Sequence, residues 1–277
     1  MSTERRVTSA AIRTRKGRPF PVITAYDAPF ARCVEAAGID VVIVGDSLGM
    51  VVLGHASTAP VDLVDMQRHA AAVARATKRM HLIVDMPFGS YETSGADAVA
   101  AAVSLVKLGG ASSVKLEGGT RAASRIAAIV AAGIPVCAHI GVLPQTAGID
   151  AGFRRRADRE TLLADARAVE AAGAFAVVLE MVEARVAGEI TAACSIPTIG
   201  IGSGLNCDAQ VLVLHDVLGL YPEAPPFAKR YAELGRVATD ALRAYADDVR
   251  EAAFPPRSDA NGRNVEGEGT YTIGGIA

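Results

Sequence analysis

The chain contains short runs of apolar, mostly β-branched residues, and most of these runs end at a glycine or a charged residue. The clearest is Val41–Val44, which leads into Gly45 and then Asp46. A continuous apolar run of this length is typical of a strand buried on both faces, as in a parallel sheet. We therefore predict a buried strand at Val41–Val44, with Asp46 at the point where the backbone leaves the core.

Similar runs recur along the chain and alternate with helical stretches that end at Gly or Pro. This alternation predicts a parallel sheet, and eight units favour an α/β fold, a single-domain (β/α)8 TIM barrel, over an open doubly wound sheet. The strands are predicted at residues 21–27, 41–44, 81–85, 113–117, 135–139, 176–180, 197–201 and 211–214. The helices are predicted at residues 29–37, 61–78, 96–108, 121–132, 161–172 and 183–193, with a long terminal helix or helix pair at 227–252. Little room remains for a helix before the last strand.

Composition divides the chain into three segments. Residues 1–19 are polar and basic and lack the apolar stretch of a secretory signal. Residues 20–253 carry the predicted barrel and its C-terminal helix. Residues 254–277 lose periodicity and gain Gly, Asn and Glu, which predicts a flexible C-terminal tail.

The bulk charge points to small-molecule chemistry. A net charge of −2 and a pI near 6.2 give no basic footprint for nucleic acid or an anionic membrane. No uninterrupted apolar run is long enough to predict a membrane span. The four cysteines show no metal-ligand spacing, so we interpret them as reduced packing residues in a cytoplasmic protein. Small polar metabolites are therefore the expected partners.

Polar residues stand at the C-terminal ends of the predicted strands, where TIM barrels carry their active sites. They are Asp46, Ser47, Asp85, Lys115, Glu117, His139 and Glu180. Each alone has a structural explanation, because a strand-end Asp often caps a helix and a His in an apolar run is often a satisfied core residue. Their convergence on one rim favours a ligand site, because burying them without a ligand would cost several kcal/mol.

The residue types indicate the chemistry. Asp46 and Asp85 are hard oxygen donors, which predicts Mg²⁺ chelated by a 2-oxo acid whose enolate the metal stabilises. Lys115 and His139 can hold the substrate carboxylate or polarise its carbonyl. Glu180 follows the apolar run Ala-Val-Val-Leu, which should raise its pKa towards neutrality, as a general base requires. Enolisation of a small oxo acid followed by bond formation is the implied reaction class.

Other features give weaker signals. The glycine-rich stretch Ile199–Gly204 is either an anion-binding backbone or a tight turn, and the sequence does not choose between them. His55, His69 and His215 are interpreted as structural residues. The basic run Arg154–Arg156 is typical of a solvated face, although it lies close to the predicted mouth of the barrel.

At these positions the sequence resembles the ketopantoate hydroxymethyltransferase (3-methyl-2-oxobutanoate hydroxymethyltransferase) family, over roughly residues 20–250. The matching stretches in the first half are Thr24-Ala-Tyr-Asp27, Val44-Gly-Asp-Ser-Leu-Gly49, Gly54-His55, Ser57-Thr58 and Asp85-Met-Pro-Phe88. Those in the second half are Val114-Lys-Leu-Glu-Gly-Gly119, His139-Ile-Gly141, Pro144-Gln145, Val178-Leu-Glu180 and Ile199-Gly-Ile-Gly202.

The resemblance implies roles for the matching residues. Those implied to bind Mg²⁺ are Asp46, Asp85 and, through water, Glu117. Those implied to contact the oxo acid are Ser47, Lys115 and His139, with the two aspartates. Glu180 is implied to be the base. The resemblance also implies a hydroxymethyl transfer from 5,10-methylenetetrahydrofolate to 3-methyl-2-oxobutanoate, giving 2-dehydropantoate for pantothenate biosynthesis, in a cytoplasmic homo-oligomer, commonly a decamer.

Two departures from the family pattern leave alternatives open. Residues 146–158 are shorter than the usual Gly-Tyr-x-Val-Gln-Gly-like segment, which is compatible with a paralogue that uses another 2-oxo acid or another one-carbon or aldehyde donor. The tail after Phe254 lacks the usual short ending. A lyase or mutase of the phosphoenolpyruvate mutase and isocitrate lyase type typically has a cysteine-bearing loop that this sequence lacks. The matched polar positions, Glu180 included, argue against an inactive metabolite-binding barrel.

Overall fold

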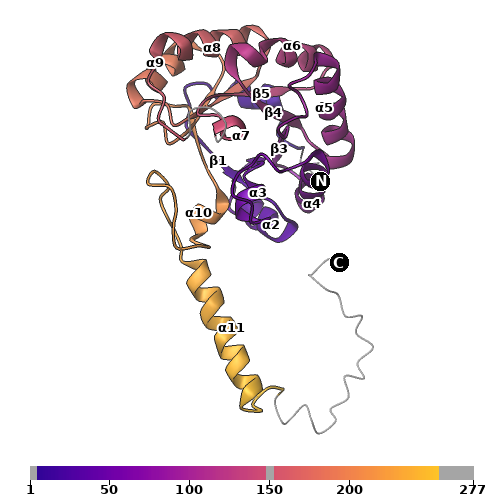
Figure 1. Ribbon diagram of the computed structural model, residues 1–277, viewed down its shortest axis with the longest axis vertical. Helices are drawn as coiled ribbons and strands as arrows, with labels where there is room; N and C mark the ends of the chain where they lie inside the picture. The colour runs from indigo at the N-terminus through magenta and orange to yellow at the C-terminus, as the bar shows by residue number, and fades with distance from the viewer. Residues whose placement is uncertain (1–4, 148–152, 256–277) are drawn as a thin grey trace.

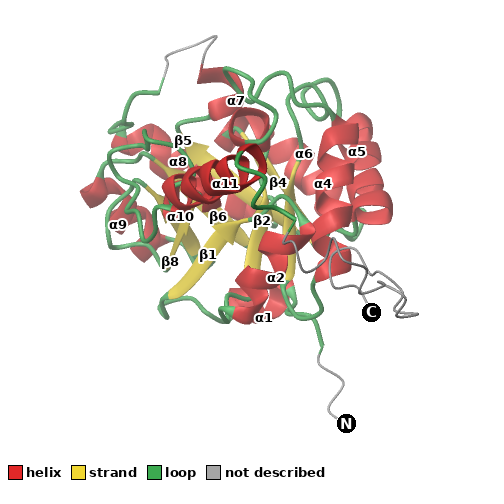
Figure 2. Ribbon diagram, turned by 90° about the horizontal axis from the view of Figure 1, so that it is seen from below, coloured by secondary structure: helices red, strands yellow, loops and turns green. Residues whose placement is uncertain are grey.

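Eight parallel strands close into a barrel with helices around it, as the sequence pattern predicted (Figures 1 and 2). The computed structural model describes residues 5–147 and 153–255. The strands, hydrogen-bonded in sequence order with β8 closing onto β1, are β1 (Phe20–Thr24), β2 (Val41–Val44), β3 (His81–Asp85), β4 (Ser113–Glu117), β5 (Val136–Gly141), β6 (Ala176–Glu180), β7 (Thr198–Ile201) and β8 (Ala209–Leu212). Strands β2, β3 and β4 are buried along their whole length, in agreement with the continuous apolar run of β2 and the apolar centre of β3, whereas β4 alternates polar and apolar residues.

The outer layer consists mainly of six helices that follow the first six strands. They are α2 (Ala28–Ala36), α4 (Leu63–Ala76), α5 (Gly95–Gly109), α6 (Ala123–Ala131), α8 (Arg159–Ala171) and α9 (Ala184–Ala193). Shorter elements are α1 (Ser9–Arg13), α3 (Leu48–Val51), the 3₁₀ turn η1 (Gly119–Ala122), α7 (Pro144–Ala147) and α10 (Leu214–Leu218). Several aspartates cap these helices: Asp27 caps α2, Asp62 forms a capping box on α4, and Asp158 caps α8. Asp46 and Asp85 cap none of the helices that the structure describes.

The N-terminal segment closes the bottom of the barrel. Ile12, on α1, is fully buried among the inward-facing residues of the barrel. Asp208 ties this segment to the sheet, because its carboxylate accepts hydrogen bonds from Gly17 N, Lys16 Nζ and the backbone and hydroxyl of Thr198. No described helix is long and apolar enough to cross a membrane.

The last βα units differ from the sequence prediction. The eighth strand begins at Ala209 instead of residue 211, because the hydrogen bonds of Asp208 to Thr198 start the pairing of β8 with β7 earlier. The predicted terminal helix over 227–252 is confined to α11 (Leu234–Arg250). Residues before it pair with the end of the barrel instead: Tyr231 N donates to Val217 O. The predicted tail at 254–277 lies almost entirely outside the described residues.

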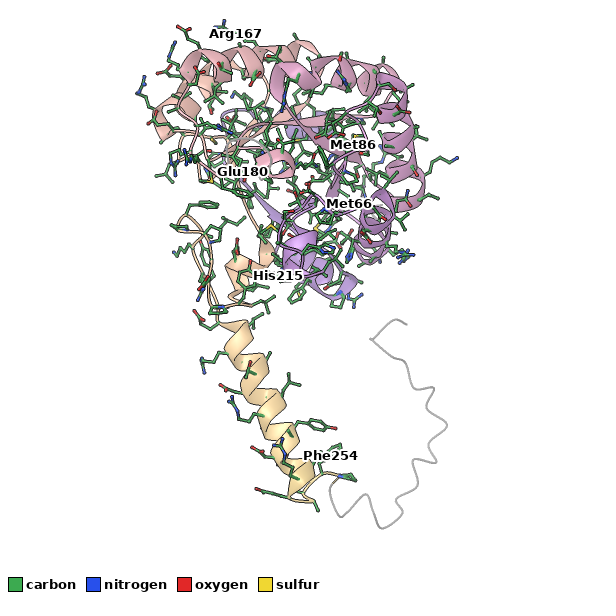
Figure 3. The ribbon with its side chains drawn as sticks, in the orientation of Figure 1. Met66, Met86, Arg167, Glu180, His215 and Phe254 are labelled. Carbon is green, nitrogen blue, oxygen red and sulfur yellow. The ribbon has the colours of Figure 1, made fainter. Side chains whose placement is uncertain are left out.

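Helix α11 extends away from the barrel and has no buried residue (Figure 1). Its large apolar side chains, which fall on one side of the helix by their spacing, are exposed. They are Val237, Leu242, Tyr245 and Val249. The opposite side carries ion pairs such as Arg243–Asp240. Figure 3 shows Phe254 beyond the far end of the helix. This helix is strongly amphipathic, and although the rings of Tyr245 and Phe254 lie 5.8 Å apart, no residue of its apolar side is buried.

Candidate active site

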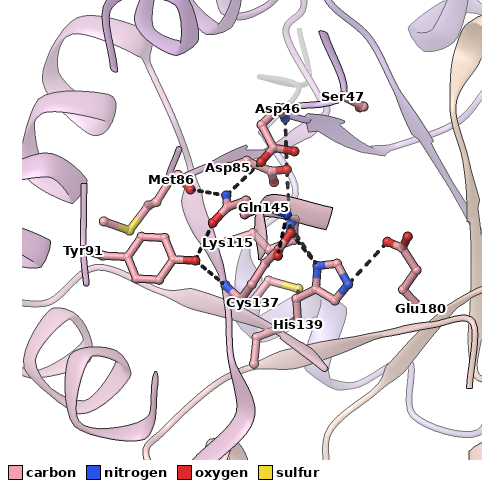
Figure 4. A network of polar contacts seen from close by, with 12 residues as sticks. Asp46, Ser47, Asp85, Met86, Tyr91, Lys115, Cys137, His139, Gln145 and Glu180 are labelled. Atoms are coloured by element: carbon pink, nitrogen blue, oxygen red, sulfur yellow. Dashed lines mark hydrogen bonds and ion pairs between the residues drawn. The ribbon is translucent and has the colours of Figure 1, made fainter. Parts of the chain in front are cut away.

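A cavity of about 900 Å³ opens at the C-terminal ends of the strands. Seven residues singled out from the sequence line it together: Asp46, Ser47, Asp85, Lys115, Glu117, His139 and Glu180. The strand register explains their convergence, because Asp85 on β3 is opposite Lys115 on β4, and Glu117 is opposite His139 on β5. Figure 4 shows the side chains of Asp85, Lys115 and His139, which come from separate strands, directed towards one another.

Asp46 and Asp85 form a buried carboxylate pair. The backbone N–H of Asp46 donates to Asp85 Oδ2 at 3.1 Å, and Lys115 Nζ lies 3.2 Å from the same oxygen. Burial raises the pKa of both carboxyls, that of Asp85 to about 7 even though Lys115 opposes the shift. The other oxygen, Asp85 Oδ1, is buried and has no hydrogen-bond partner among the residues that the structure describes. A buried carboxylate oxygen without a partner is a free ligand position.

Lys115 is the ammonium group at the centre of this set. Its Nζ lies 3.1 Å from His139 Nδ1 and 3.9 Å from Glu117 Oε1. Burial by itself disfavours the charged form, but the carboxylates around it, Asp85 first, outweigh burial and raise the pKa of Lys115. Lys115 is therefore protonated at neutral pH and donates to its neighbours.

Burial, together with the charge on Lys115, sets the protonation state of His139. Burial and the nearby ammonium group hold the pKa of His139 well below its ordinary value, so the imidazole is neutral. Because Lys115 donates to Nδ1, the hydrogen-bond pattern assigns the imidazole proton to Nε2. Nε2 has no hydrogen-bond partner among the described residues and points towards Glu180 Oε2, 3.4 Å away (Figure 4). His139 thus presents an N–H donor to the cavity.

Glu180 ends β6 beside the cavity. Burial raises the pKa of its carboxyl to about 7, with Lys115 acting in the opposite direction. Its strand neighbour is Gly141, whose φ of +99° and close approach to the Glu180 carbonyl leave no room for a side chain. This close backbone packing fixes the position from which the carboxylate reaches the cavity.

Ser47 is positioned by an aromatic residue. Tyr26 is almost fully buried, and its hydroxyl lies 2.9 Å from Ser47 Oγ. His69 in turn bonds the Tyr26 carbonyl through Nδ1 at 2.6 Å, which supports its interpretation as a structural residue. His55, interpreted in the same way, instead lines the cavity.

Two functional residues were not proposed from the sequence. Gln145 donates through Nε2 to Asp46 Oδ2 and to Met86 O, both at 2.8 Å, and its backbone N–H donates to Glu117 Oε2. Tyr91 donates to Gln145 Oε1 at 2.5 Å and accepts from Glu117 N. For Gln145 the only sequence signal was its place in the matched pair Pro144-Gln145. Tyr91 gave no signal, because it lies in an irregular loop and does not stand at the end of a strand.

The glycine-rich stretch after β7 adopts the tight-turn role. Ser203 bridges two strands, since its hydroxyl donates to Leu179 O and accepts from Val182 N. Gly202 has a φ of +62°, and a Cβ there would meet the ring of Phe227. Arg155, from the basic run, donates to the carbonyls of Val182 and Gly202 and also lines the cavity. The variant loop is described only in part, because residues 148–152 lie outside the described ranges.

The carboxylate oxygens of this site suit a cation that takes only some of its ligands from the protein and the others from water and substrate. The described residues contain no group of three or more His, Cys, Asp or Glu arranged as a metal cage. However, four carboxyl groups share one ammonium group, which leaves an excess of potential negative charge. Mg²⁺ typically binds through one or two carboxylates and completes its octahedron with water and substrate. Asp46 and the unpartnered Oδ1 of Asp85 fit that pattern.

A TIM barrel with a buried acid–base set at the C-terminal ends of its strands is an enzyme that acts on a small polar molecule. Comparison of the sequence with those of known proteins identifies its relatives. The profile of the ketopantoate hydroxymethyltransferase family matches residues 6–257. The chain is 50% identical to the 3-methyl-2-oxobutanoate hydroxymethyltransferases of Ignicoccus hospitalis, covering 87% of this chain and 93% of that protein, and of Thermus thermophilus, covering 88% and 95%.

The chain belongs to the ketopantoate hydroxymethyltransferase family. The expectation drawn from the sequence is therefore confirmed, and the protein is a transferase. Among solved structures, phosphonopyruvate hydrolase superposes with a TM-score of 0.58 at 16% identity, covering 94% of this chain and 93% of that one. Oxaloacetate acetylhydrolase superposes with a TM-score of 0.60 at 15% identity, covering 91% and 92%. At this identity the likeness extends to the fold alone.

Gln145→Met should destabilise the protein by about 2–4 kcal/mol, because it leaves the buried acceptors on Asp46 and Met86 without their donor. The measurement is the free energy of unfolding from urea denaturation. Gln67→Met is the matched control, since it removes one half-buried hydrogen bond to Ser104 and should cost about 1 kcal/mol or less. Equal losses in the two variants would show that the Gln145 network has no special energetic role.

Proposed function

We propose that the protein transfers a hydroxymethyl group from 5,10-methylenetetrahydrofolate to the enolate of 3-methyl-2-oxobutanoate, giving 2-dehydropantoate in pantothenate biosynthesis. Water supplies the hydroxyl oxygen, and tetrahydrofolate is the second product. The observation that carries this proposal is the placement of Glu180, a base with a pKa near 7, beside a neutral His139 donor and a buried carboxylate pair. The names of the relatives support the reaction.

Glu180 acts first in this scheme. Its carboxylate accepts the C3 proton of the oxo acid, and a base with a pKa near the working pH transfers protons most effectively. The electron pair from the broken C–H bond moves to the carbonyl oxygen. Water adds to the methylene carbon of the one-carbon donor and both of its C–N bonds break, which releases tetrahydrofolate and leaves formaldehyde. The enolate carbon attacks the formaldehyde carbon, forming the new C–C bond, and the resulting alkoxide takes up a proton to become the hydroxyl group.

Three other groups bind and orient the oxo acid. The Lys115 ammonium group and the Ser47 hydroxyl hold its carboxylate, and the His139 Nε2–H donates to an oxygen that gains negative charge. Asp46 and Asp85 would hold Mg²⁺, with Glu117 reaching it through water. When bound there, Mg²⁺ supplies Lewis-acid stabilisation of the charge on the keto oxygen.

The variant segment 146–158 supports a second candidate, a paralogue with another 2-oxo acid or another one-carbon or aldehyde donor. Two residues of this segment, Phe153 and Arg155, line the cavity, so its sequence can influence substrate choice. Comparing turnover of 3-methyl-2-oxobutanoate with turnover of unbranched and acidic oxo acids separates the two candidates. Preference for a different oxo acid would favour the paralogue.

Glu180→Gln should reduce deuterium exchange at C3 of 3-methyl-2-oxobutanoate by at least about 100-fold, because the amide cannot accept the proton. Binding of the oxo acid and of metal should change little. In the wild type, exchange should rise with pH up to about 7 and level off above it, since the raised pKa leaves Glu180 protonated below that value. The measurement is exchange followed by NMR without folate. Unchanged exchange in Glu180→Gln would remove Glu180 from the mechanism.

Asp85→Asn should raise the Mg²⁺ concentration for half-maximal exchange by at least about 10-fold, because it removes one charged oxygen ligand. Binding of Mn²⁺ measured by calorimetry should weaken in parallel. Asp97→Asn, on the outer helix α5, is the control and should leave both values unchanged. Full wild-type exchange in excess chelator would contradict metal dependence.

We also propose that α11 packs on a second copy of the chain in a cytoplasmic homo-oligomer, a decamer by family resemblance. The outer face of the barrel has a gap that supports this: Pro21 on β1 and Gln210 on β8 are register partners, and both are exposed. Helices of the outer layer follow β1 to β6, whereas none of the described helices lies between β7 and β8. A helix of 17 residues, about 25 Å long, with an exposed apolar side fits such a gap.

Leu242→Asp combined with Tyr245→Asp should dissociate the oligomer, because two charges would be buried in the proposed interface. Light scattering after gel filtration should then show smaller species, down to the 28.6 kDa monomer. Arg243→Gln, on the polar side of α11, is the control and should keep the wild-type mass. An unchanged mass in the double variant would place α11 outside the interface.

A further inference from the structure

The cavity extends well beyond the acid–base set. At about 900 Å³ it is near the upper end of pockets that hold drug-sized ligands, roughly 300–1,000 Å³, and a five-carbon oxo acid would fill only part of it. The remaining part is lined by α10 and the segment that follows it, including Asp216, Tyr221 and Phe227. None of these residues has a part in the chemistry described above.

Asp216 is the buried charged group of this second part. Asp216 is only 4% exposed, yet it lines the cavity. Tyr221 OH donates a short hydrogen bond to Oδ1. The second oxygen, Oδ2, receives no hydrogen bond from the described residues. Oδ2 is not among the enclosed atoms that lack a partner, so it keeps some solvent contact, and a ligand donor can reach it from the cavity.

A column of rings connects Asp216 to the oxo-acid site. The Tyr26 and His215 ring centroids are 5.4 Å apart, and His215 stacks on Tyr221 at 6.4 Å with an interplanar angle of 14°. Tyr26 contacts Ser47 at one end of the column, and Tyr221 contacts Asp216 at the other. Figure 3 shows Glu180 on the barrel and His215 on α10, at the two sides of this region.

Phe227 supplies an apolar wall. Its ring lies against Gly202, where a side chain on residue 202 would collide with it. The two prolines before it, Pro225 and Pro226, also line the cavity. A flat apolar wall beside an anionic hydrogen-bond acceptor suits a planar heterocycle that carries donors along one edge.

We propose that Asp216 binds the aminopyrimidinone edge of the pterin ring in the folate co-substrate. This inference rests on the folate-dependent reaction proposed above. A pterin presents its 2-amino group and the adjacent ring N–H as two donors side by side. A carboxylate can accept both at once in the bidentate manner it uses with arginine, and Oδ1 retains a lone pair after binding Tyr221. Arg155 lines the same cavity and offers a cation for the anionic glutamyl part of folate.

Asp216 has a competing structural role. Its hydrogen bond to Tyr221 also holds the segment after α10 against the barrel, so loss of the carboxylate could act through that segment. Tyr221→Phe separates the two roles, because it removes the hydrogen bond and keeps the carboxylate and the ring. Glu223→Gln is the charge control, since Glu223 lines the same cavity but is exposed.

The test measures tetrahydrofolate binding by calorimetry, KM for 5,10-methylenetetrahydrofolate, and folate-independent C3 exchange. Asp216→Asn should weaken tetrahydrofolate binding and raise that KM by about 10- to 100-fold, because an amide cannot accept two hydrogen bonds from the pterin edge. Its C3 exchange should stay within about three-fold of wild type. Tyr221→Phe and Glu223→Gln should change folate binding by at most about three-fold.

Two outcomes would overturn the assignment. The first is unchanged tetrahydrofolate binding in Asp216→Asn. The second is a loss of tetrahydrofolate binding in Tyr221→Phe as large as that in Asp216→Asn, which would show that Asp216 acts by holding the segment after α10 in place. A 6-methyltetrahydropterin probe sharpens the test, because it should bind the wild type and lose the same factor in Asp216→Asn. Failure of the wild type to bind tetrahydrofolate while it still exchanges C3 protons would instead contradict the folate donor itself.

Discussion

One buried ammonium group, that of Lys115, organises the site. Four carboxyl groups, an imidazole and a thiol surround or face it, and burial alone would drive it to the neutral form. The carboxylates keep it charged, and it in turn keeps His139 neutral and limits the rise in the pKa of Glu180. Removing one partner of such a buried set leaves the others uncompensated, which is why the set behaves as a unit.

The charge balance of this set gives the site its chemical character. A single positive charge cannot neutralise all the carboxyl groups, so they retain protons or attract a cation. Both states are useful to an enzyme. A carboxyl group with a pKa near 7 exchanges protons at neutral pH, and a carboxylate pair with a free oxygen can hold Mg²⁺. Gln145 donates to the carboxylates of Asp46 and Glu117, and Tyr91 donates to the Gln145 side-chain oxygen, so neutral groups hold these carboxylates in place without adding charge.

The long cavity places this charged set at one end and a more apolar region at the other. The first end is made by strands β2 to β6, where the register aligns the side chains. The second end is made by α10 and the segment before α11, held by Tyr221 and by the packing of Phe227 on Gly202. The two-substrate transfer that we propose needs both regions, because in that scheme the enolate forms beside Glu180 and meets its partner without leaving the barrel.

The sequence by itself determined the barrel, five of its strands to within one residue, and seven of the polar residues around the cavity. Continuous apolar runs specify buried strands, and parallel strands bring their C-terminal ends to one rim. Tertiary structure alone decided the contacts of Gln145 and Tyr91, the start of β8 and the length of the last helix. These depend on hydrogen bonds between different segments of the chain, such as Gln145 to Asp46 and Thr198 to Asp208, and such contacts leave no periodic pattern in the local sequence.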